Sequence, residues 1–210
     1  MSARVVILTK APVPGQVKTR LAEGIGSESA AYVHELMVFE TIRRAQQTNL
    51  DVIVSLANDE HAVFAKHLST LGVAVEPQAR GDLGDRLAHA MRHPGLSIAL
   101  GTDCVVFDPS WLTDAAESAA DASVGPSDDG GYWMIALDGS NPKLSEAAFS
   151  DMPWSTPTLF AKTQDRLRSS GFSLNRVSGA YDVDDLSDLR RLATDQRCAD
   201  SIRSAVKALL

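Results

Sequence analysis

Three separated aspartates are the residues of this sequence best suited to metal chemistry. Asp103 follows the short apolar run 97–100, and Asp182 and Asp184 alternate further along the chain. Alternate residues of an extended segment point the same way, so these carboxylates could form a hard oxygen site suited to Mg²⁺ or Mn²⁺ carrying phosphates. The structural alternative is that Asp103 caps a turn and that Asp184 or Asp185 caps a helix.

A basic loop follows the first apolar run and carries Lys10, Lys18 and Arg20. Gly15 lets the backbone approach a ligand closely, and Arg20 could hold a phosphate bidentately. The loop is not a Walker A motif, because Pro12 stands where its first glycine is required, and the chain has no Gly-x-Gly-x-x-Gly fingerprint. We favour phosphate binding over a merely solvated basic loop.

The segment Gly81–Arg86 has both a structural and a functional interpretation. Asp82 is a good N-cap, which explains its place before an apolar helical stripe. The two glycines, Gly81 and Gly84, also leave backbone open to a flat ligand such as a base, and Arg86 could serve a phosphate or pair with Asp82. The residues alone leave both interpretations open.

A second group of polar residues combines acids with aromatic rings, at Asp128, Asp129, Gly130, Gly131, Tyr132 and Trp133. Asp-Gly by itself signals a hairpin. Acids beside aromatic rings are also what a sugar requires, since its hydroxyls take hydrogen bonds and its faces stack. Trp154, Ser155 and Thr156 could close the same pocket, although Ser and Thr are also good helix caps.

Other chemistries find little support. The chain lacks the Gly-x-Ser-x-Gly elbow of serine hydrolases. Its five histidines fall mostly in predicted helices without zinc-site partners. Cys104 precedes an apolar run and is interpreted as a small buried residue beside Asp103.

Composition sets broad limits on partners and location. The net charge of −7 and the lack of a Lys/Arg block disfavour nucleic acid and anionic membranes. No apolar run approaches the roughly 18 residues of a membrane span. With 44% hydrophobic residues and two cysteines, we expect a cytoplasmic protein that forms one domain over residues 1–210. The oligomeric state stays open.

The elements expected to position these residues alternate along the chain. Apolar runs predict strands at 5–8, 52–56, 73–75, 97–100, 122–125, 132–137 and 174–177. Helices are expected over 27–47 and 60–71, and further helices are expected to open at 81–87, at 108–109 and at 155–157. Residues 182–210 are expected to be mostly helical. This alternation predicts an α/β fold, with a largely parallel sheet covered by helices on both faces.

Several motifs occur together in the order Lys10-Ala-Pro-x-Pro-Gly-x-Val-Lys-Thr-Arg-Leu21, Gly81-Asp-Leu-Gly-x-Arg-Leu87, Gly101-Thr-Asp103, Gly125-Pro-x-x-Asp-Gly-Gly-Tyr132, Trp154-Ser-Thr156 and Asp182-Val-Asp184. In this combination the sequence resembles the DUF2064 family of glycosyltransferase-like proteins, which includes arsenosugar-biosynthesis glycosyltransferases. The resemblance implies a GT-A fold, a Rossmann-like three-layer α/β/α sandwich with a mostly parallel, mixed sheet. That superfamily also contains nucleotidyltransferases.

The resemblance also implies roles on the nucleotide side. Lys18 and Arg20 would hold phosphates, and residues 81–86 would border the base and ribose. Thr102 stands where the family usually has Ser, so the hydroxyl is kept. Val105 replaces a Pro, which removes a rigid turn.

The remaining implied roles concern the metal and the acceptor. Asp103 would be the main ligand of Mg²⁺ or Mn²⁺, with Asp184 as second ligand and Asp182 in support. Asp129 and Tyr132 would face the sugar or the acceptor.

Three hypotheses follow. The first is a metal-dependent glycosyltransferase that moves a sugar from a nucleotide sugar to a small acceptor, with Asp103, Lys18 and Asp129 as catalytic residues. The second is a nucleotidyltransferase of guanylyl or cytidylyl type, which joins an NTP to a phosphorylated acceptor and releases pyrophosphate. The third is a non-catalytic nucleotide-binding module, which would not require the acids near Asp184.

Overall fold

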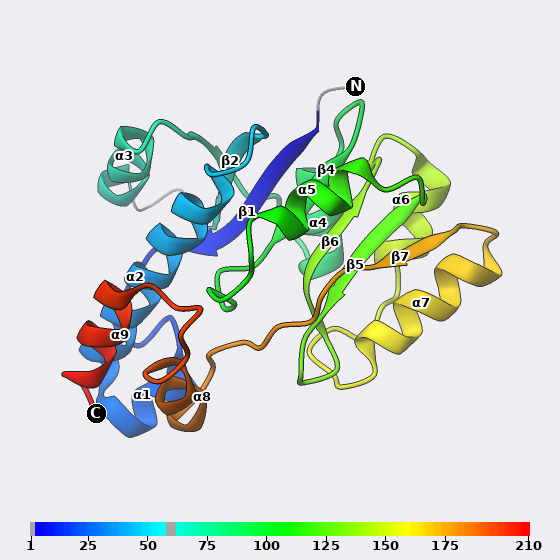
Figure 1. Cartoon of the computed structure of the whole chain (residues 1–210). Helices are drawn as coiled ribbons and strands as arrows, with labels where there is room; N and C mark the ends of the chain where they lie inside the picture. Colours follow the sequence, from blue (N-terminus) through cyan, green and yellow to red (C-terminus); the bar gives the residue numbers. More distant parts are fainter. Residues whose placement is uncertain (1–2, 58–61) are drawn as a thin grey trace.

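A seven-stranded mixed sheet runs through the computed structural model, which describes residues 3–57 and 62–210 (Figure 1). The strands are β1 (Arg4–Lys10), β2 (Asp51–Ala57), β3 (Ala74–Pro77), β4 (Ser97–Leu100), β5 (Ala122–Pro126), β6 (Tyr132–Leu137) and β7 (Leu174–Arg176). Their order is β3-β2-β1-β4-β6-β5-β7. β6 runs antiparallel to β4 and β5, and the other neighbours are parallel. The predicted mostly parallel, mixed sheet is therefore confirmed.

The centre of the sheet follows directly from its apolar runs. Val5 to Ile7 are buried, and so is every residue of β4, as expected for strands covered on both faces. In the parallel pair, Val5 lies opposite Ile98 and Ile7 opposite Leu100. Because the register is in phase, the segments that follow β1 and β4 leave the sheet at the same edge.

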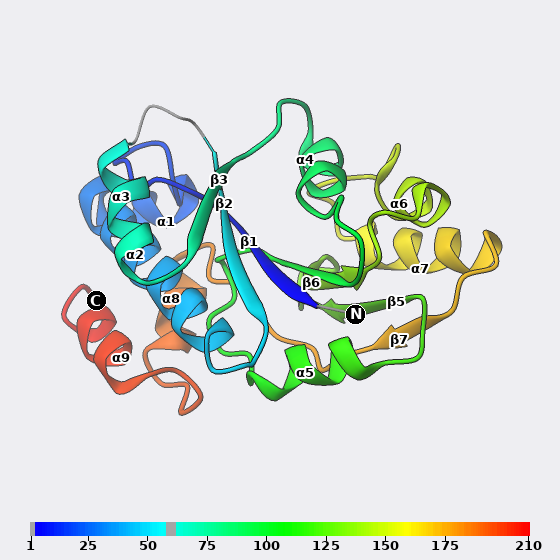
Figure 2. The same ribbon diagram turned by 90° about the horizontal axis from the view of Figure 1, so that it is seen from above.

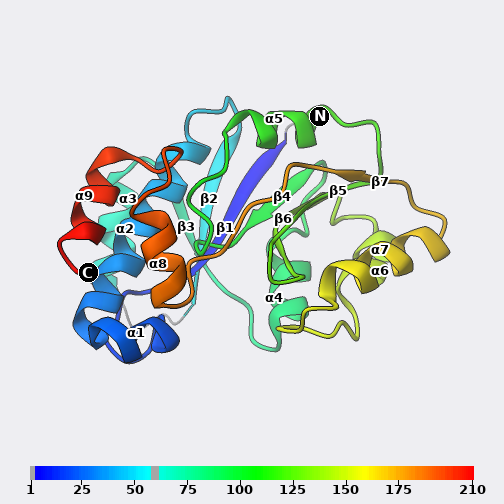
Figure 3. The same cartoon turned by 60° about the horizontal axis from the view of Figure 1, so that its bottom comes forward.

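Helices cover both faces of the sheet, as Figures 2 and 3 show. One face carries α1 (Thr19–Ile25), α2 (Ser27–Ala45), α3 (Ala62–Thr70), α5 (Ser110–Glu117), α8 (Leu186–Leu192) and α9 (Asp200–Lys207). The other carries α4 (Leu83–Ala90), α6 (Pro142–Phe149) and α7 (Leu159–Ser169). Each face has its own hydrophobic core, and adjacent residues of β4 serve different cores, Ile98 and Leu100 on one face and Ala99 on the other. The predicted three layers are confirmed.

Some predicted helix boundaries are wrong. The basic loop ends in α1, which we did not predict, and α6 was also missed. The helix expected from Ser155 begins only at Leu159, because Thr158 is its N-cap. The C-terminal segment, expected to be mostly helical, contains two short helices: α8 ends at Leu192, and α9 starts at Asp200. The expected start of the helix over 60–71 lies outside the described residues.

Within residues 3–57 and 62–210, no helix combines the length and the apolar character needed to cross a membrane.

Candidate functional site

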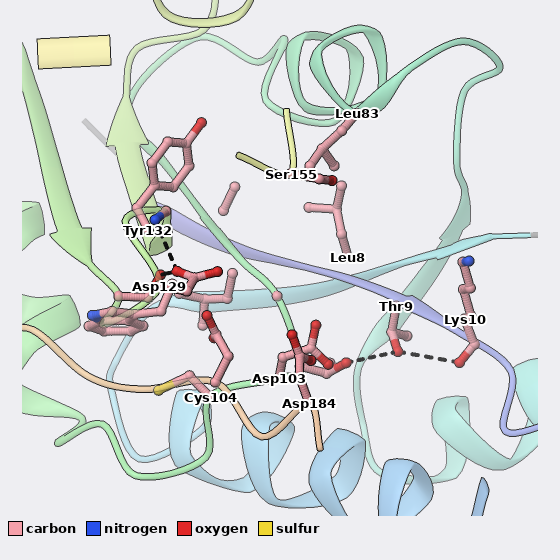
Figure 4. A pocket seen from close by; sticks show the side chains of 18 of the residues that line it. Leu8, Thr9, Lys10, Leu83, Asp103, Cys104, Asp129, Tyr132, Ser155 and Asp184 are labelled. Atoms are coloured by element: carbon pink, nitrogen blue, oxygen red, sulfur yellow. Dashed lines mark hydrogen bonds between the residues drawn. The ribbon is translucent and has the colours of Figure 1, made fainter. Parts of the chain in front are cut away.

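A cavity of about 700 Å³, here called the cleft, opens where β1 and β4 end (Figure 4). The predicted site residues that line it are Lys10, Lys18, Arg20, Arg86, Thr102, Asp103, Asp129, Gly131, Tyr132, Ser155, Thr156, Asp182 and Asp184. Figure 4 shows Asp103 and Asp184 side by side, with Lys10 on one side of them and Asp129 on the other. The fold thus gathers polar residues from segments far apart in the sequence.

Lys18 lies at the end of the cleft that carries Asp103 and Asp184. Its Nζ donates to the carbonyl oxygen of Val183 at 2.7 Å and to Asp184 Oδ1 at 3.1 Å, and it forms an ion pair with Asp103 Oδ1. The Lys18 side chain is only 5% exposed. Its backbone is left-handed, with φ 47° and ψ 45°, an uncommon conformation for a residue other than glycine. The ammonium therefore joins the segment after β4 to the segment before α8.

The ion pair is strong enough to override the effect of burial on both partners. Burial lowers the pKa of an ammonium and raises that of a carboxyl. The nearby opposite charges outweigh it, so the pKa of Lys18 is raised and the pKa of Asp103 is lowered. Both groups stay charged across the physiological range.

Backbone contacts fix the two carboxylate-bearing segments against each other. The amide of Val183 donates to the carbonyl oxygen of Asp103 at 2.9 Å. Asp185 caps α8 with a capping box, so Asp184 is held one residue before the cap. Arg20 approaches the same region from α1, with its guanidinium 3.7 Å from Asp184 Oδ2 and 3.7 Å from Asp185 Oδ2.

Asp182 differs from its neighbours in protonation. Burial, followed by the negative charges of Asp103 and Asp129, raises the pKa of Asp182 to about 7. An ordinary Asp titrates at about 4. Asp182 is therefore partly protonated at neutral pH, whereas Asp103 is not.

The opposite wall of the cleft is the turn between β5 and β6. Asp129 Oδ1 accepts from the Ser127 hydroxyl at 2.5 Å and from the Gly131 amide at 2.9 Å. Gly130 has φ 87°, and an added Cβ would lie 2.0 Å from the carbonyl oxygen of Pro157. Only glycine fits there, so this turn is pressed against the chain that leads into α7.

The two adjacent acids of this turn point in different directions. Asp129 faces the cleft, whereas Asp128 pairs with Arg191 of α8, its Oδ2 2.7 Å from Arg191 Nη1. The guanidinium of Arg191 also stacks on the ring of Tyr181, 3.6 Å from its centroid. Asp128 thus ties the turn to α8.

Among the described residues, the predicted ones that do not line the cleft are Gly15, Gly81, Asp82, Asp128, Gly130 and Trp154. Asp82 caps α4: its Oδ1 accepts from the Asp85 amide at 2.9 Å, and its own amide donates back to Asp85 Oδ2 at 3.1 Å. The capping interpretation of Asp82 is therefore confirmed. Arg86 Nε donates to the Asp82 carbonyl at 3.1 Å and lies on the cleft surface.

The sequence analysis missed several polar residues of the cleft, among them His34 and Gln78. His34 Nε2 lies 3.1 Å from the carbonyl oxygen of Lys10. Gln78 Nε2 donates to the carbonyl of Thr9 at 3.1 Å, and the Thr9 hydroxyl lies 3.3 Å from that of Thr102. His34 had a usable signal, since it falls on the buried stripe of α2. Gln78 had none.

Tyr132, which lines the cleft, and the neighbouring Trp154 form what is here called the aromatic wall, which contains buried polar atoms without a hydrogen-bond partner. Among the described residues, the Tyr132 hydroxyl and the indole N–H of Trp154 are of this kind. Their rings meet edge to face, with centroids 6.5 Å apart. Burial raises the pKa of Tyr132, so its hydroxyl stays protonated. Such unpaired groups are costly unless a ligand or water satisfies them.

The expected metal site is not preformed in this arrangement. Within the described part of the chain, no three His, Cys, Asp or Glu side chains are grouped so that they could hold a metal ion. The position between Asp103 and Asp184 is taken by the ammonium of Lys18. The carboxylates have the right chemistry for Mg²⁺ or Mn²⁺, but as placed they serve an internal cation.

Comparison with known proteins places the chain in a family. A family model described as "Uncharacterized protein conserved in bacteria (DUF2064)" matches residues 40–156, more than half of the sequence. The chain belongs to the DUF2064 family. The resemblance inferred from the motifs is thus confirmed, and the matched region of this DUF2064 chain contains Asp103 and Asp129. No curated protein matches the sequence.

Solved structures share the fold of this DUF2064 protein. A candidate nucleotide-diphospho-sugar transferase from Desulfovibrio desulfuricans G20 has a TM-score of 0.89 at 23% identity, over 100% of this chain and 97% of that one. An inositol-1-phosphate CTP transferase from T. maritima has a TM-score of 0.58 at 13% identity, over 100% and 97%. A nucleotidyl transferase from Methanothermobacter thermautotroptrophicus has 0.58 at 16%, over 99% of both chains. The predicted fold class is confirmed.

Proposed function

We propose that this DUF2064 protein is a glycosyltransferase that takes a nucleotide sugar into the cleft and passes its sugar to a small acceptor. One observation carries the proposal. A single cleft places the Lys18 ammonium and the Arg20 guanidinium beside Asp103 and Asp184 at one end, and Asp129 at the other. The solved structures with the same fold, named as nucleotide-using transferases, support it.

The nucleotide side would bind the diphosphate of the donor. Lys10 and Arg20 are exposed there, and Arg20 is held only by two 3.7 Å contacts, so it is free to turn toward a phosphate. Leu8, Leu83 and Arg86 line the adjoining wall, and we assign the base and ribose to that wall.

The acceptor side would provide the general base of the reaction, the carboxylate of Asp129. Both neutral donors to Asp129 bind its Oδ1, which fixes the carboxylate and leaves Oδ2 to take a proton from an acceptor hydroxyl. The acceptor oxygen then bonds to the anomeric carbon as the bond from that carbon to the diphosphate oxygen breaks. The electron pair leaves with the nucleoside diphosphate, whose charge the cations of the basic loop stabilise.

The aromatic wall supports a sugar in this position. Tyr132 lines the cleft with its aromatic ring, and Ser155 and Thr156 add hydroxyls to the lining. Hydrogen-bonding groups beside an aromatic ring match the alternating polar and apolar surfaces of a sugar.

Nucleotidyl transfer is the second candidate. It is favoured by the concentration of Lys10, Lys18 and Arg20 in the segment from the end of β1 to the start of α1, which suits a pyrophosphate leaving group. In that reaction an oxygen of a phosphorylated acceptor attacks the α-phosphorus of an NTP, and the bond to pyrophosphate breaks.

Product analysis separates the two reactions. The protein would be incubated with Mg²⁺ or Mn²⁺, a panel of nucleotide sugars and NTPs, and a mixture of hydroxylated and phosphorylated small acceptors. Release of nucleoside diphosphate from one nucleotide sugar, about 100-fold slower with Asp129→Asn, is the expected result. Release of pyrophosphate from an NTP would replace glycosyl transfer by the second candidate. Release of neither product from any donor would contradict both.

A further inference from the structure

The ammonium of Lys18 has no free hydrogen-bond donor in this structure. An ammonium has three N–H groups and no acceptor. Three oxygens take them: the carbonyl of Val183 at 2.7 Å, Asp184 Oδ1 at 3.1 Å, and Asp103 Oδ1. Lys18 can bind a phosphate only by giving up at least one of these partners.

The partners of Lys18 are also the carboxylates that a divalent cation would need. A metal ion at Asp103 and Asp184 and an ammonium on the same two oxygens would repel each other at short range. The carboxylates therefore hold one cation tightly or the other, but not both. Phosphate changes this balance, because it offers Lys18 new negatively charged partners.

Two features of the chain suit such an exchange. Lys18 adopts a left-handed backbone, which non-glycine residues occupy only when surrounding contacts stabilise it, and here those contacts include the ion pairs. Arg20, two residues on, is 66% exposed and reaches Asp184 from the solvent side. An incoming phosphate would therefore meet a loosely held guanidinium next to the buried ammonium.

We propose that Lys18 is an exchangeable internal counterion that closes the metal site until a diphosphate draws it away. Binding of the diphosphate and binding of the metal are then cooperative, because each removes the obstacle to the other. The identity of the diphosphate rests on the proposed function. The competition between Lys18 and the metal does not.

The first test measures Mn²⁺ binding alone, by electron paramagnetic resonance of free Mn²⁺, on the full chain without nucleotide. Lys18→Met removes the ammonium and keeps an unbranched side chain. We expect it to bind Mn²⁺ about ten-fold or more tighter than the wild type. The matched control is Lys10→Met, which also removes a positive charge from the cleft lining, at a residue that forms no ion pair among those described. It should change the affinity much less.

A second measurement uses the wild-type protein, so it does not depend on the folding of a variant. Mn²⁺ affinity is compared with and without inorganic pyrophosphate, and Asp103→Asn serves as the reference for Mn²⁺ that pyrophosphate binds in solution. We expect about a ten-fold or greater gain with pyrophosphate in the wild type. A smaller gain in Lys18→Met would show that Lys18 carries the coupling.

The inference is overturned if Lys18→Met binds Mn²⁺ no better than Lys10→Met, or if pyrophosphate leaves the wild-type affinity unchanged. Both results are independent of turnover. A protein that transfers sugar but shows neither effect would retain the proposed function and lose this inference. A protein that shows both effects without sugar or nucleotidyl transfer would retain this inference and lose the proposed function.

Discussion

The two walls of the cleft use opposite means to hold an aspartate. On the side that we propose binds the nucleotide, Asp103 is paired with a buried ammonium that lowers its pKa. On the side that we propose binds the acceptor, Asp129 is held by a hydroxyl and an amide, both neutral. The charged partner favours the ionised form of Asp103, whereas the two neutral donors fix the orientation of the Asp129 carboxylate without supplying a counter-charge.

The largest effect should follow from Asp103→Asn. The change removes the charge that Lys18 and any metal would share, so we expect kcat/KM to fall about 1000-fold or more. Steady-state release of nucleoside diphosphate measures it. Loss of less than ten-fold would mean that the nucleotide wall does not depend on this charge, and the contrast between the walls would fail.

The acceptor wall is tested with a pair of adjacent variants. Asp129→Asn should lower kcat about 100-fold with little change in the KM for the donor, because the base is lost and the donor contacts remain. Asp128→Asn is the matched control, since it keeps the same turn but acts at the Arg191 pair outside the cleft. Its ion pair is half-exposed, so the expected effect is small. Equal losses in the two variants would contradict the assignment of Asp129.

The turn that carries Asp129 can be tested through stability. Gly130→Ala places a Cβ where the Pro157 carbonyl lies and forces a left-handed backbone. We expect destabilisation of about 1–3 kcal/mol, measured by urea unfolding. Gly15→Ala is the control, because it shares a positive φ but has open space around its Cβ. A smaller loss in Gly130→Ala than in Gly15→Ala would show that the turn is not pressed against α7.

The smallest predicted effect concerns Asp182, between the two walls. Its pKa is raised to about 7 in the folded state, so the folded protein binds a proton that the unfolded chain has lost above about pH 4. This contribution to stability is present at low pH and is lost as the pH rises through 7. Asp182→Asn should therefore raise the Tm at pH 8 by a few degrees relative to the wild type and change it little at pH 4. Thermal unfolding at the two pH values decides this, and a pH-independent difference would contradict it.

The sheet was predictable because its strands are apolar runs with little local competition. Val5 to Ile7 and Ser97–Leu100 are short runs whose side chains become buried on both faces of a sheet covered by helices. The missed helices show the limit. α1 follows a Pro/Gly loop, and the residue before it, Lys18, has a left-handed backbone that the sequence pattern did not indicate. α6 had a signal, Asn141 as N-cap with a proline after it, that was overlooked.

The candidate site was predictable by residue type more than by geometry. The carboxylate after the apolar run 97–100 and the cations after the first apolar run indicated which side chains to consider. Their contacts depended on tertiary structure. Whether Asp128 or Asp129 faces the cleft is decided by a turn backed by Pro157 and by the position of Arg191. The insertion of Lys18 between two carboxylates depends on how α1 and the segment before α8 converge.

The contact between Lys18 and Asp184 joins positions 166 residues apart. A chain emerging from the ribosome therefore completes every strand of the described sheet before it can make this contact. A nascent or prematurely terminated polypeptide would contain the strands and Asp103 but lack Asp184, the second carboxylate partner of Lys18. Synthesis of the last segment, rather than folding of the sheet, is what completes the pair of carboxylates that holds the Lys18 ammonium.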